Sequence, residues 1–317
     1  MGIIRRIKQI KGVKQFVYRP KIRRIHRKIE SAYRKYVHWL STRGTKPIDS
    51  ATNTQADRSE MYIITIAFNT EILIEKQIEL IKQHVKDASY HLVVADNSSK
   101  TKKRKIIKHI CEQNGVEYIG VPRYINRLTW NTLFQPSYSH GAALNWIFYH
   151  LLTERRPKRF TILDHDIFPV RDCNLTETLA GRDFYGVGRE RLSAWYLWCG
   201  WSIFNFDAII DQQPDFSPIH VNDIYLDTGG ANYLQIYRHY DRQTITFPEI
   251  KTRRIKKTPS LKLHDDICRA DCIQLINRSW IHLINGSNYA HIEGKEDTIE
   301  KVLARIHEIQ FKNDELY

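Results

Sequence analysis

The feature that most constrains the fold is the alternation of short β-type apolar runs with amphipathic segments in the first half of the chain. Runs that are short and rich in β-branched residues predict buried strands, whereas apolar residues three and four positions apart predict helices. Strands are expected at 61–68, 91–95, 117–121 and from 160, and helices at 71–85, 100–114 and 139–153. Strands that alternate with helices form a largely parallel sheet through right-handed crossovers. The sequence therefore predicts an α/β fold.

The strand that begins at Phe160 runs directly into two carboxylates, Asp164 and Asp166, and Pro169 follows soon after them. The end of a buried strand lies at the rim of the sheet, where α/β proteins bind their ligands. Mg²⁺ and Mn²⁺ take one or two carboxylates together with substrate phosphates. We therefore predict a metal–diphosphate site here. The alternative is a turn in which the two side chains accept hydrogen bonds from backbone amides.

A second candidate segment, Ser139–Asn145, opens the helix that precedes the paired acids. Gly141 and the two alanines after it allow close approach at the helix amino terminus, which attracts anions. Asn145 lies one helical turn further on, where its amide suits a phosphate or an ordinary interior contact. Both interpretations of Asn145 stay open.

Beyond the paired acids the pattern changes, and strands are expected at 183–187, 194–206, 244–247 and 280–286, with an irregular loop at 122–136. A helix is expected from about 227 to 237, an amphipathic helix closes the chain at 299–309, and the basic segment 251–262 is either disordered or a lid. The strand 194–206 is rich in aromatic residues, which suit sugar rings. We expect Trp198, Gly200 and Trp201 to contact an acceptor, although about half of this aromatic set is expected to be core.

Charge separates an amino-terminal arm from the body. Residues 1–46 contain fifteen Lys and Arg and a single acid, Glu30, so they hold the whole formal charge of +14, while the remainder is neutral. Isoleucines and aromatic residues at helical spacing predict a basic amphipathic helix over 1–46, followed by a linker at 47–60 and a globular domain at 61–317. Such a helix suits an anionic membrane surface. The alternatives are packing on the body or a partner, and nucleic acid.

Cysteine usage and hydropathy indicate the compartment. The five cysteines form an odd count without zinc-type pairs, which favours a reducing environment. No apolar run is long enough to span a bilayer, and basic residues interrupt the apolar positions that a signal peptide needs. We expect a cytoplasmic protein that is peripheral at the inner face of the membrane.

Four motifs in order along the chain resemble the GT-A-fold glycosyltransferases, most closely glycosyltransferase family two. They are an aromatic–Asn pair after the first strand (Phe68-Asn69), an acidic turn after the second (Asp96–Ser99), the Gly/Ala-rich helix start that ends in Asn145, and Asp164-His-Asp166. The resemblance covers residues 61–234, with a looser extension to 286. It implies a Rossmann-like central sheet, with 61–170 as the nucleotide-binding half and 171–317 as the acceptor-binding half.

The resemblance also implies roles for individual residues. The nucleotide-sugar donor would be bound by Phe68, Asn69, Asp96, Ser98, Asn145 and Asp164, and a divalent metal, Mn²⁺ or Mg²⁺, by Asp164, Asp166 and His282. The general base of inverting members corresponds best to Asp227 and next to Asp223, although the family's usual second acid beside Asp227 is absent. Asp227 also suits a helix N-cap, and His282 also suits a structural role.

Together these features predict an enzyme that transfers a sugar from a nucleotide-diphosphate sugar to a hydroxyl of a glycan or lipid-linked acceptor, in the synthesis of surface or lipid-linked glycans. A sugar nucleotidyltransferase is one alternative, but the residues after the first strand, Asn69–Ile72, lack the Gly-rich loop with Arg that it needs. The other alternative is a non-catalytic nucleic-acid-binding protein that uses the basic arm, whose binding would depend steeply on salt.

Overall fold

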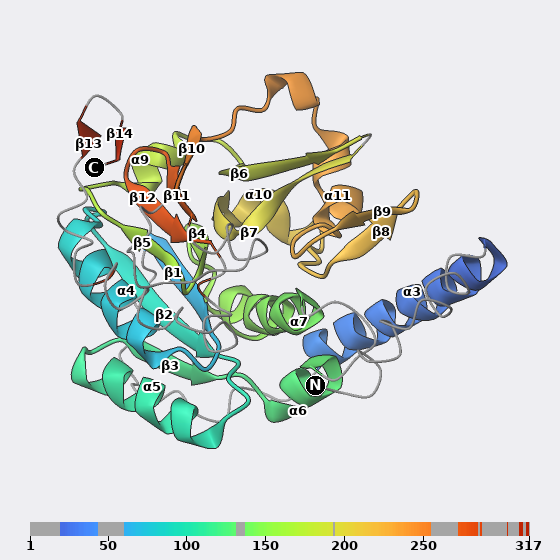
Figure 1. Ribbon diagram of the computed structural model, residues 1–317, viewed down its shortest axis with the longest axis horizontal. Helices are drawn as coiled ribbons and strands as arrows, with labels where there is room; N and C mark the ends of the chain where they lie inside the picture. The colour runs from blue at the N-terminus through green and yellow to red at the C-terminus, as the bar shows by residue number, and fades with distance from the viewer. Residues whose placement is uncertain are drawn as a thin grey trace.

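A six-stranded mixed sheet forms the centre of the molecule in the computed structural model (Figure 1). The structure describes residues 20–43, 60–130, 137–192, 194–254, 272–284, 286, 303, 311–312 and 315–316. The strand order is β3-β2-β1-β4-β7-β6. The bounds are β1 Met61–Ala67, β2 Tyr90–Asp96, β3 Glu117–Gly120, β4 Arg159–Asp164, β6 Phe184–Arg191 and β7 Ala194–Asn205.

The first four strands of this order are parallel, as the alternating sequence pattern predicts, and β7 and β6 are added antiparallel to β4. Successive residues of β1 enter opposite faces of the sheet. Ile64 and Ile66 join one core cluster, and Ile63 and Ala67 join the other. The predicted α/β architecture, with a central, mainly parallel sheet flanked by helices, is confirmed.

Helices cover both faces of the sheet (Figure 1). On one face lie α4 (Glu71–His84) and α5 (Thr101–Gln113), with the short α9 (Leu175–Leu179). On the other lies α7 (Ser137–Ile147), which continues through a π-helical turn (Phe148–Leu152) into α8 (Thr153–Arg155). The short α10 (Phe206–Ile210) follows β7 and buries Phe206 and Ile209 in the same core as α7.

A second sheet continues from the end of β4. The chain turns through Asp164–Asp166 into β5 (Ile167–Pro169), which pairs with β12 (Trp280–Leu283) in the order β10-β11-β12-β5. β10 spans Ile250–Arg254 and β11 spans Cys272–Ile276. A hairpin of β8 (Ile219–Val221) and β9 (Ile224–Leu226) precedes Asp227, and the short β13 (Phe311–Lys312) pairs with β14 (Glu315–Leu316). The paired acids therefore lie at the junction between the two large sheets.

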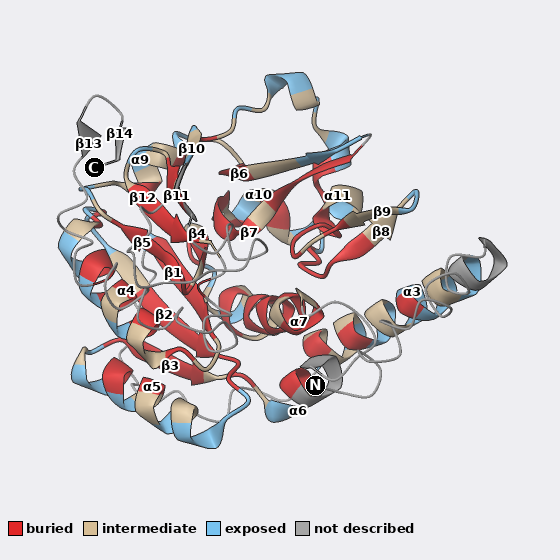
Figure 2. Cartoon of the chain, viewed as in Figure 1, coloured by how far each residue is buried: buried red, intermediate tan, exposed pale blue. Residues whose placement is uncertain are grey.

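Part of the predicted arm is an integral element of the body. Helix α3 (Pro20–Thr42) packs against α7, α6 (Arg123–Trp130) and β8. Its inward face buries Glu30, Val37 and Ser41, whereas its outward face is exposed (Figure 2). The packing alternative therefore holds for 20–42. Residues 1–19 and most of the predicted linker lie outside the described residues.

Several local predictions differ from the structure. Residues 123–130 of the expected loop form α6, because Tyr124 and Ile125 pack on the core. The expected strand at 244–247 is absent, and a 3₁₀ turn (Arg242–Thr244) stands at its start. The expected helix up to 237 is reduced to α11 (Asn232–Gln235) and a 3₁₀ turn (Tyr237–His239). Most of 251–262 and of the closing helix at 299–309 lie outside the described residues.

Within the described parts of the chain, none of the helices has the length and apolar character needed to cross a bilayer.

Candidate active site

Three strands of the parallel sheet end together, and each carries predicted site residues at its end. In the strand register Ala67 lies beside Asp96, and Ile66 lies beside Asp164. Asn69 follows β1, Ser98 follows β2 and Asp166 follows β4. Because parallel strands present their carboxyl ends at one edge, segments far apart in sequence meet there. Three of the four sequence motifs, those after β1, β2 and β4, thus meet at a single rim.

The Asp164–Asp166 turn is fixed from behind by residues that the sequence reasoning did not select. His165 contacts the carbonyl oxygen of Ile66 through Nδ1 at 2.8 Å. Gln77 of α4 donates from Nε2 to the carbonyl oxygens of Asp164 at 2.8 Å and Ile167 at 2.7 Å. The Oε1 of Gln77 in turn accepts a 2.6 Å hydrogen bond from the hydroxyl of Thr65. These contacts hold the backbone so that the two carboxylates flank a buried histidine.

Three carboxylates interact at this rim. Burial raises the pKa of Asp164 well above its ordinary value, and the negative charges of Asp166 and Asp227 raise it further. Like charges held this close in a poorly solvated site favour a proton or a cation. The structure thus brings Asp227, from the segment after β9, to the acids that follow β4.

His140 is the functional residue that the sequence reasoning missed. It belongs to the first turn of α7, and its Nε2 lies 3.3 Å from Oδ1 of Asp164. Burial and the nearby His165 together lower the pKa of His140 to about 4, so the imidazole is neutral at pH 7. The signal for finding it was present, because His140 directly precedes the Gly141 that marks the helix start.

His282 lies where the sequence places a metal ligand. Its Nε2 is 3.8 Å from Oδ1 of Asp166, and its Nδ1 is 3.0 Å from Oε1 of Gln274. An Nδ1–H that donates to Gln274 leaves the lone pair of Nε2 facing Asp166, which is the arrangement of a metal-binding histidine. Burial lowers the pKa of His282 and keeps it neutral.

The backbone also comes close at this point. A Cβ added to Gly286 would lie 2.7 Å from Cβ of Asp166. In the part of the chain that the structure describes, no three His, Cys, Asp or Glu side chains already converge as a complete metal site. Asp166 and His282 supply two donors of the types that Mn²⁺ accepts, and in sites of this kind substrate phosphates provide further ligands. The residues present therefore fit a cation that is held jointly by the protein and a diphosphate.

The loops after β1 and β2 are tied to each other. The backbone N–H of Asn69 donates to Oγ of Ser98 at 2.7 Å, and Asn69, whose φ is 55°, donates from Nδ2 to Oγ of Ser99 at 3.0 Å. Asp96 is fully buried and accepts from the hydroxyl of Tyr118 at 2.9 Å and from the N–H of Ser98 at 2.8 Å. These contacts shape the predicted nucleotide loop, next to the partly exposed Phe68.

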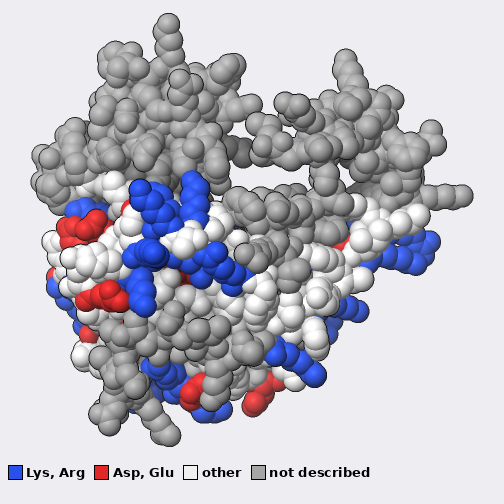
Figure 3. All heavy atoms as spheres, turned by 90° about the horizontal axis from the view of Figure 1, so that it is seen from below, with Lys and Arg blue, Asp and Glu red and all other residues white. Residues whose placement is uncertain are grey.

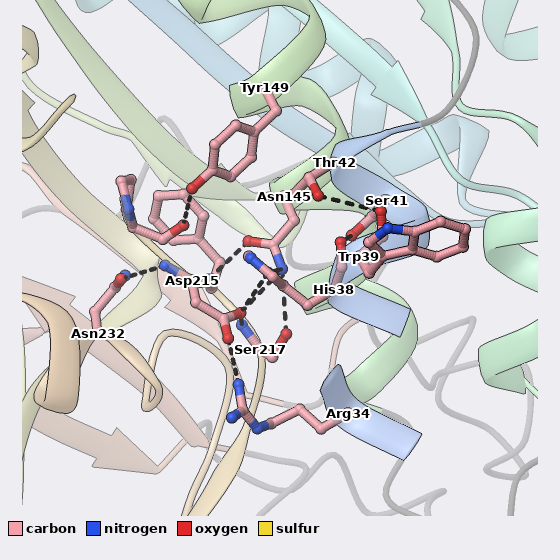
Figure 4. Close-up of polar contacts among 12 residues, drawn as sticks. Arg34, His38, Trp39, Ser41, Thr42, Asn145, Tyr149, Asp215, Ser217 and Asn232 are labelled. Atoms are coloured by element: carbon pink, nitrogen blue, oxygen red, sulfur yellow. Dashed lines mark hydrogen bonds and ion pairs between the residues drawn. The ribbon is translucent and has the colours of Figure 1, made fainter. Parts of the chain in front are cut away.

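Asn145 occupies a buried polar network rather than the rim (Figure 4). Its Nδ2 donates to Oδ1 of Asp215 at 3.0 Å and to Oγ of Ser217 at 3.1 Å, and its Oδ1 accepts from the N–H of Phe216 at 2.8 Å. Arg34 and His38 of α3 contact the same Asp215. Of the two interpretations of Asn145, these contacts match the interior one.

The predicted acceptor residues divide into two kinds. Trp198 is partly exposed, and its indole lies over Gly200, where an added Cβ would come within 2.1 Å of the ring. The same indole lies beside His282, with the two ring centroids 4.9 Å apart. Trp201 is fully buried and packs on Trp280 and Tyr185 in the core. Trp198 is therefore the aromatic residue of this set that remains close to the metal-type ligands.

The two predicted bases occupy different places. Asp227 is near the acids, and its Oδ1 accepts from the N–H of Thr228 at 2.8 Å. It does not cap a helix, because the N-cap residue of α11 is Ala231. Asp223 lies in the β8–β9 turn, is largely exposed and pairs with Arg27 of α3 at 3.5 Å. Geometry thus favours Asp227 over Asp223.

No protein-family model and no curated protein matches the sequence. Among solved structures, the mannosyltransferase PcManGT from Pyrobaculum calidifontis, in complex with GDP-Man and Mn²⁺, is similar at 13% identity, with 59% of this chain and 56% of that chain covered and a TM-score of 0.34. The galactosyltransferase LgtC, in complex with donor and acceptor sugar analogs, is similar at 15% identity, with 47% of this chain and 59% of that chain covered and a TM-score of 0.36. The mannosyltransferase Ktr4p from S. cerevisiae is similar at 10% identity, with 57% of this chain and 66% of that chain covered and a TM-score of 0.34.

The chain thus spans less than two thirds of each of these three structures, all of which are glycosyltransferases by name, the class that the sequence motifs resemble. Because identity and TM-score are both low, we infer function from the residues of the site.

Proposed function

We propose that this protein is a glycosyltransferase that moves a sugar from a nucleotide-diphosphate sugar to a hydroxyl group with the help of a divalent metal. The observation that carries the proposal is the meeting of Asp164, Asp166 and Asp227 at the carboxyl edge of the sheet. Strand β2, the parallel neighbour of β1, ends at the same edge and continues into the loop Asp96–Ser98. A nucleotide on that loop would direct its diphosphate toward the paired acids.

Asp166 and His282 would hold the metal, with Asp164 beside them. A divalent cation there would supply positive charge to neutralise the departing diphosphate. Gln77 and His165 keep the two carboxylates in place through the backbone. The half-buried, neutral His140 lies beside Asp164, with its Nε2 3.3 Å from Oδ1 of that carboxyl group.

Asp227 is the residue we propose as general base. An attacking hydroxyl must lose its proton, and a carboxylate within hydrogen-bond reach can accept it. The backbone on both sides of this carboxylate is fixed, since the N–H of Asp227 donates to the hydroxyl of Tyr196 at 3.0 Å and Gly229 has a φ of 89°. Trp198 would offer its exposed part to the sugar ring.

A binding screen tests the donor site directly. UDP, GDP, CDP and dTDP are each added with Mn²⁺ or with chelator, and the melting temperature is recorded. A ligand at one hundred times its dissociation constant stabilises the folded state by about 2.7 kcal/mol. We expect one nucleotide to raise the melting temperature with Mn²⁺ only, and Asp166→Ala to abolish the rise. No metal-dependent shift with any of the four would reject the proposal.

We also propose that the protein works at an anionic membrane surface on the cytoplasmic side, in the synthesis of surface or lipid-linked glycans. On the outward side of α3, Ile25, Ile29, Tyr36 and Trp39 are 59%, 57%, 49% and 49% exposed. They recur at helical spacing and form one apolar stripe. The exposed Arg24, Lys28, Lys35 and Arg43 flank it, and Figure 3 shows basic side chains toward the outer end of this helix and over α5. An apolar stripe with basic borders suits a membrane interface.

Vesicle sedimentation tests this surface in the intact chain. The double variant Ile29→Gln/Trp39→Gln should lose most of its binding to vesicles of phosphatidylcholine with phosphatidylserine. The control is Leu192→Gln, which alters an apolar side chain that is 96% exposed in the β6–β7 connection. Equal sedimentation of both variants with the wild type would exclude the stripe as the membrane contact.

A further inference from the structure

A second cavity lies outside the acid site, between α3 and the β8–β9 hairpin. Its volume is about 380 Å³, which is within the range of small-ligand sites. Six side chains of α3 line it, and five of them are basic or polar residues on one face of the helix, with Glu30 beside them: Arg24, Arg27, Lys28, Ser31 and Arg34. Tyr138 of α7, Ile219 and His220 of β8, and Asp223 of the hairpin turn close the other side.

The charges of this cavity do not balance. Arg34 pairs with Asp215, Arg27 pairs with Asp223, and the carboxylate of Glu30 is engaged by His220 at 3.0 Å and by the hydroxyl of Tyr138 at 3.2 Å. Among the described residues, no carboxylate pairs with Arg24 or Lys28. These two side chains therefore leave an excess of positive charge at the mouth of the cavity.

Buried donors point to the same conclusion. Nη1 of Arg27 and Nε of Arg34 are shielded from solvent and find no hydrogen-bond acceptor within the described part of the chain. Guanidinium groups with spare donors are suited to the oxygen atoms of a phosphate. A cavity with two unpaired cations and two unused donors is suited to an anion that has several acceptor oxygens.

We propose that this cavity binds a phosphate or diphosphate group. Arg24 and Lys28 would supply the charge, and Arg27 and Arg34 the directed hydrogen bonds. Because Asp223 is largely exposed, it can yield Arg27 to a stronger anion.

The position of the cavity connects it to the acid site. Tyr138 and His140 are two residues apart on the first turn of α7, so they point to nearly opposite sides of the helix. Tyr138 lines the cavity, and His140 contacts Asp164. In addition, the hairpin that borders the cavity leads directly into Asp227. On the basis of the proposed function, which this step requires, the bound group belongs to the acceptor.

The experiment measures binding of inorganic pyrophosphate by titration calorimetry in chelator, so that a metal at the acid site cannot contribute. The test variant is Arg24→Gln/Lys28→Gln, and the matched control is Lys35→Gln/Arg43→Gln on the same helix. Both pairs are exposed, so neither substitution disturbs the core. Loss of two cations that face a phosphate should weaken binding at least tenfold in the test variant and leave the control near wild type.

A parallel titration with geranyl pyrophosphate identifies the source of the group. Tighter binding than inorganic pyrophosphate supports a lipid-borne diphosphate, and equal binding supports the same site with a soluble phosphorylated acceptor. Absence of pyrophosphate binding, or equal weakening in both variants, overturns the proposal.

Metal-dependent nucleotide binding separates this proposal from the enzymatic one. It should persist in Arg24→Gln/Lys28→Gln, and pyrophosphate binding in chelator should persist in Asp166→Ala.

Discussion

At the scale of single residues, the acid site contains two groups of side chains. One group is the carboxylates proposed for the chemistry, and the other supports the turn that carries the paired acids. The charges of Asp166 and Asp227 act on Asp164, whereas Gln77 and His165 contact backbone carbonyl oxygens around the Asp164–Asp166 turn. Substitutions in the two groups should therefore separate chemistry from stability.

Asp227→Asn tests the general base. We expect transfer of labelled sugar to a membrane extract to fall by about 10²- to 10⁴-fold, because the amide cannot take the proton of the attacking hydroxyl. Binding of nucleoside diphosphate with Mn²⁺ should change little. Asp223→Asn is the control, since Asp223 is exposed in the hairpin turn, and it should keep most of the activity. The opposite order of effects would assign the base to Asp223.

Gln77→Leu tests the support of the acid turn. The carbonyl oxygens of Asp164 and Ile167 would lose a buried donor, which costs about 1–3 kcal/mol for each group left unsatisfied. Urea unfolding should show this loss in the free energy of unfolding. Gln83→Leu, at an exposed position of the same helix, should leave that free energy unchanged within about 0.5 kcal/mol. A loss of similar size in both variants would show that the two hydrogen bonds of Gln77 do not stabilise the acid turn.

At the scale of elements, α3 is joined to the body by a buried ionic network. Burial by itself would raise the pKa of Asp215, but hydrogen bonding and charge from His38, the charge of Arg34 and the hydroxyl of Ser217 hold it well below its ordinary value. A carboxyl group with a depressed pKa in the folded state stabilises the fold above the unfolded pKa, and this stabilisation is lost as the pH falls through the folded value.

Asp215→Asn should reveal this network as a pH dependence. At pH 7 the variant leaves Arg34 buried without its counter-charge, which costs about 3–5 kcal/mol. Below about pH 4, the ordinary value for Asp, the carboxyl of residue 215 becomes protonated in the unfolded chain but stays ionised in the folded one. Its stabilising contribution then falls with pH, so the difference in free energy of unfolding between wild type and variant should shrink. Urea titrations at pH 7, 5 and 3 measure it. A difference that stays constant over this range would contradict a charged Asp215.

At the scale of the whole molecule, helix α3 and the α/β body pack together over the described residues. Three faces of α3 have different surroundings. Glu30 and Val37 pack inward, Arg24 and Lys28 border the cavity, and Ile29 and its apolar neighbours form the exposed stripe. The proposed membrane contact and the proposed anion cavity thus lie on different faces of one helix.

A chain that starts at residue 44 should therefore be less stable than the full chain by at least about 3 kcal/mol, because Asp215 and Asn145 lose the partners that α3 provides. Chemical unfolding followed by near-ultraviolet circular dichroism measures the difference. If the arm were an independent appendage, the truncated chain would unfold at the same urea concentration as the full one. For the same reason, substitutions in the stripe test membrane binding more cleanly than removal of the arm.

The sequence by itself determined the parallel half of the sheet and the order of its motifs. Short apolar runs rich in β-branched residues and apolar residues at helical spacing are local properties, and they located β1, β2, β3 and β4 with the helices between them. Because parallel strands end at one edge, the same pattern was enough to bring Asn69, Asp96 and Asp164 to a single rim.

What only the tertiary structure decided depends on contacts between distant segments. Nothing local to Asn145 distinguishes a phosphate ligand from the partner of Asp215, which lies seventy residues away. Trp198 and Trp201 share one strand, yet packing against Trp280 buries one of them and leaves the other partly exposed. The basic helix near the amino terminus has the composition of a detached arm, and only contacts with distant segments, such as the pairing of Arg34 with Asp215 and the burial of Val37, make it part of the body. Long-range burial and charge pairing have no signature at sequence spacing, so these assignments required the folded chain.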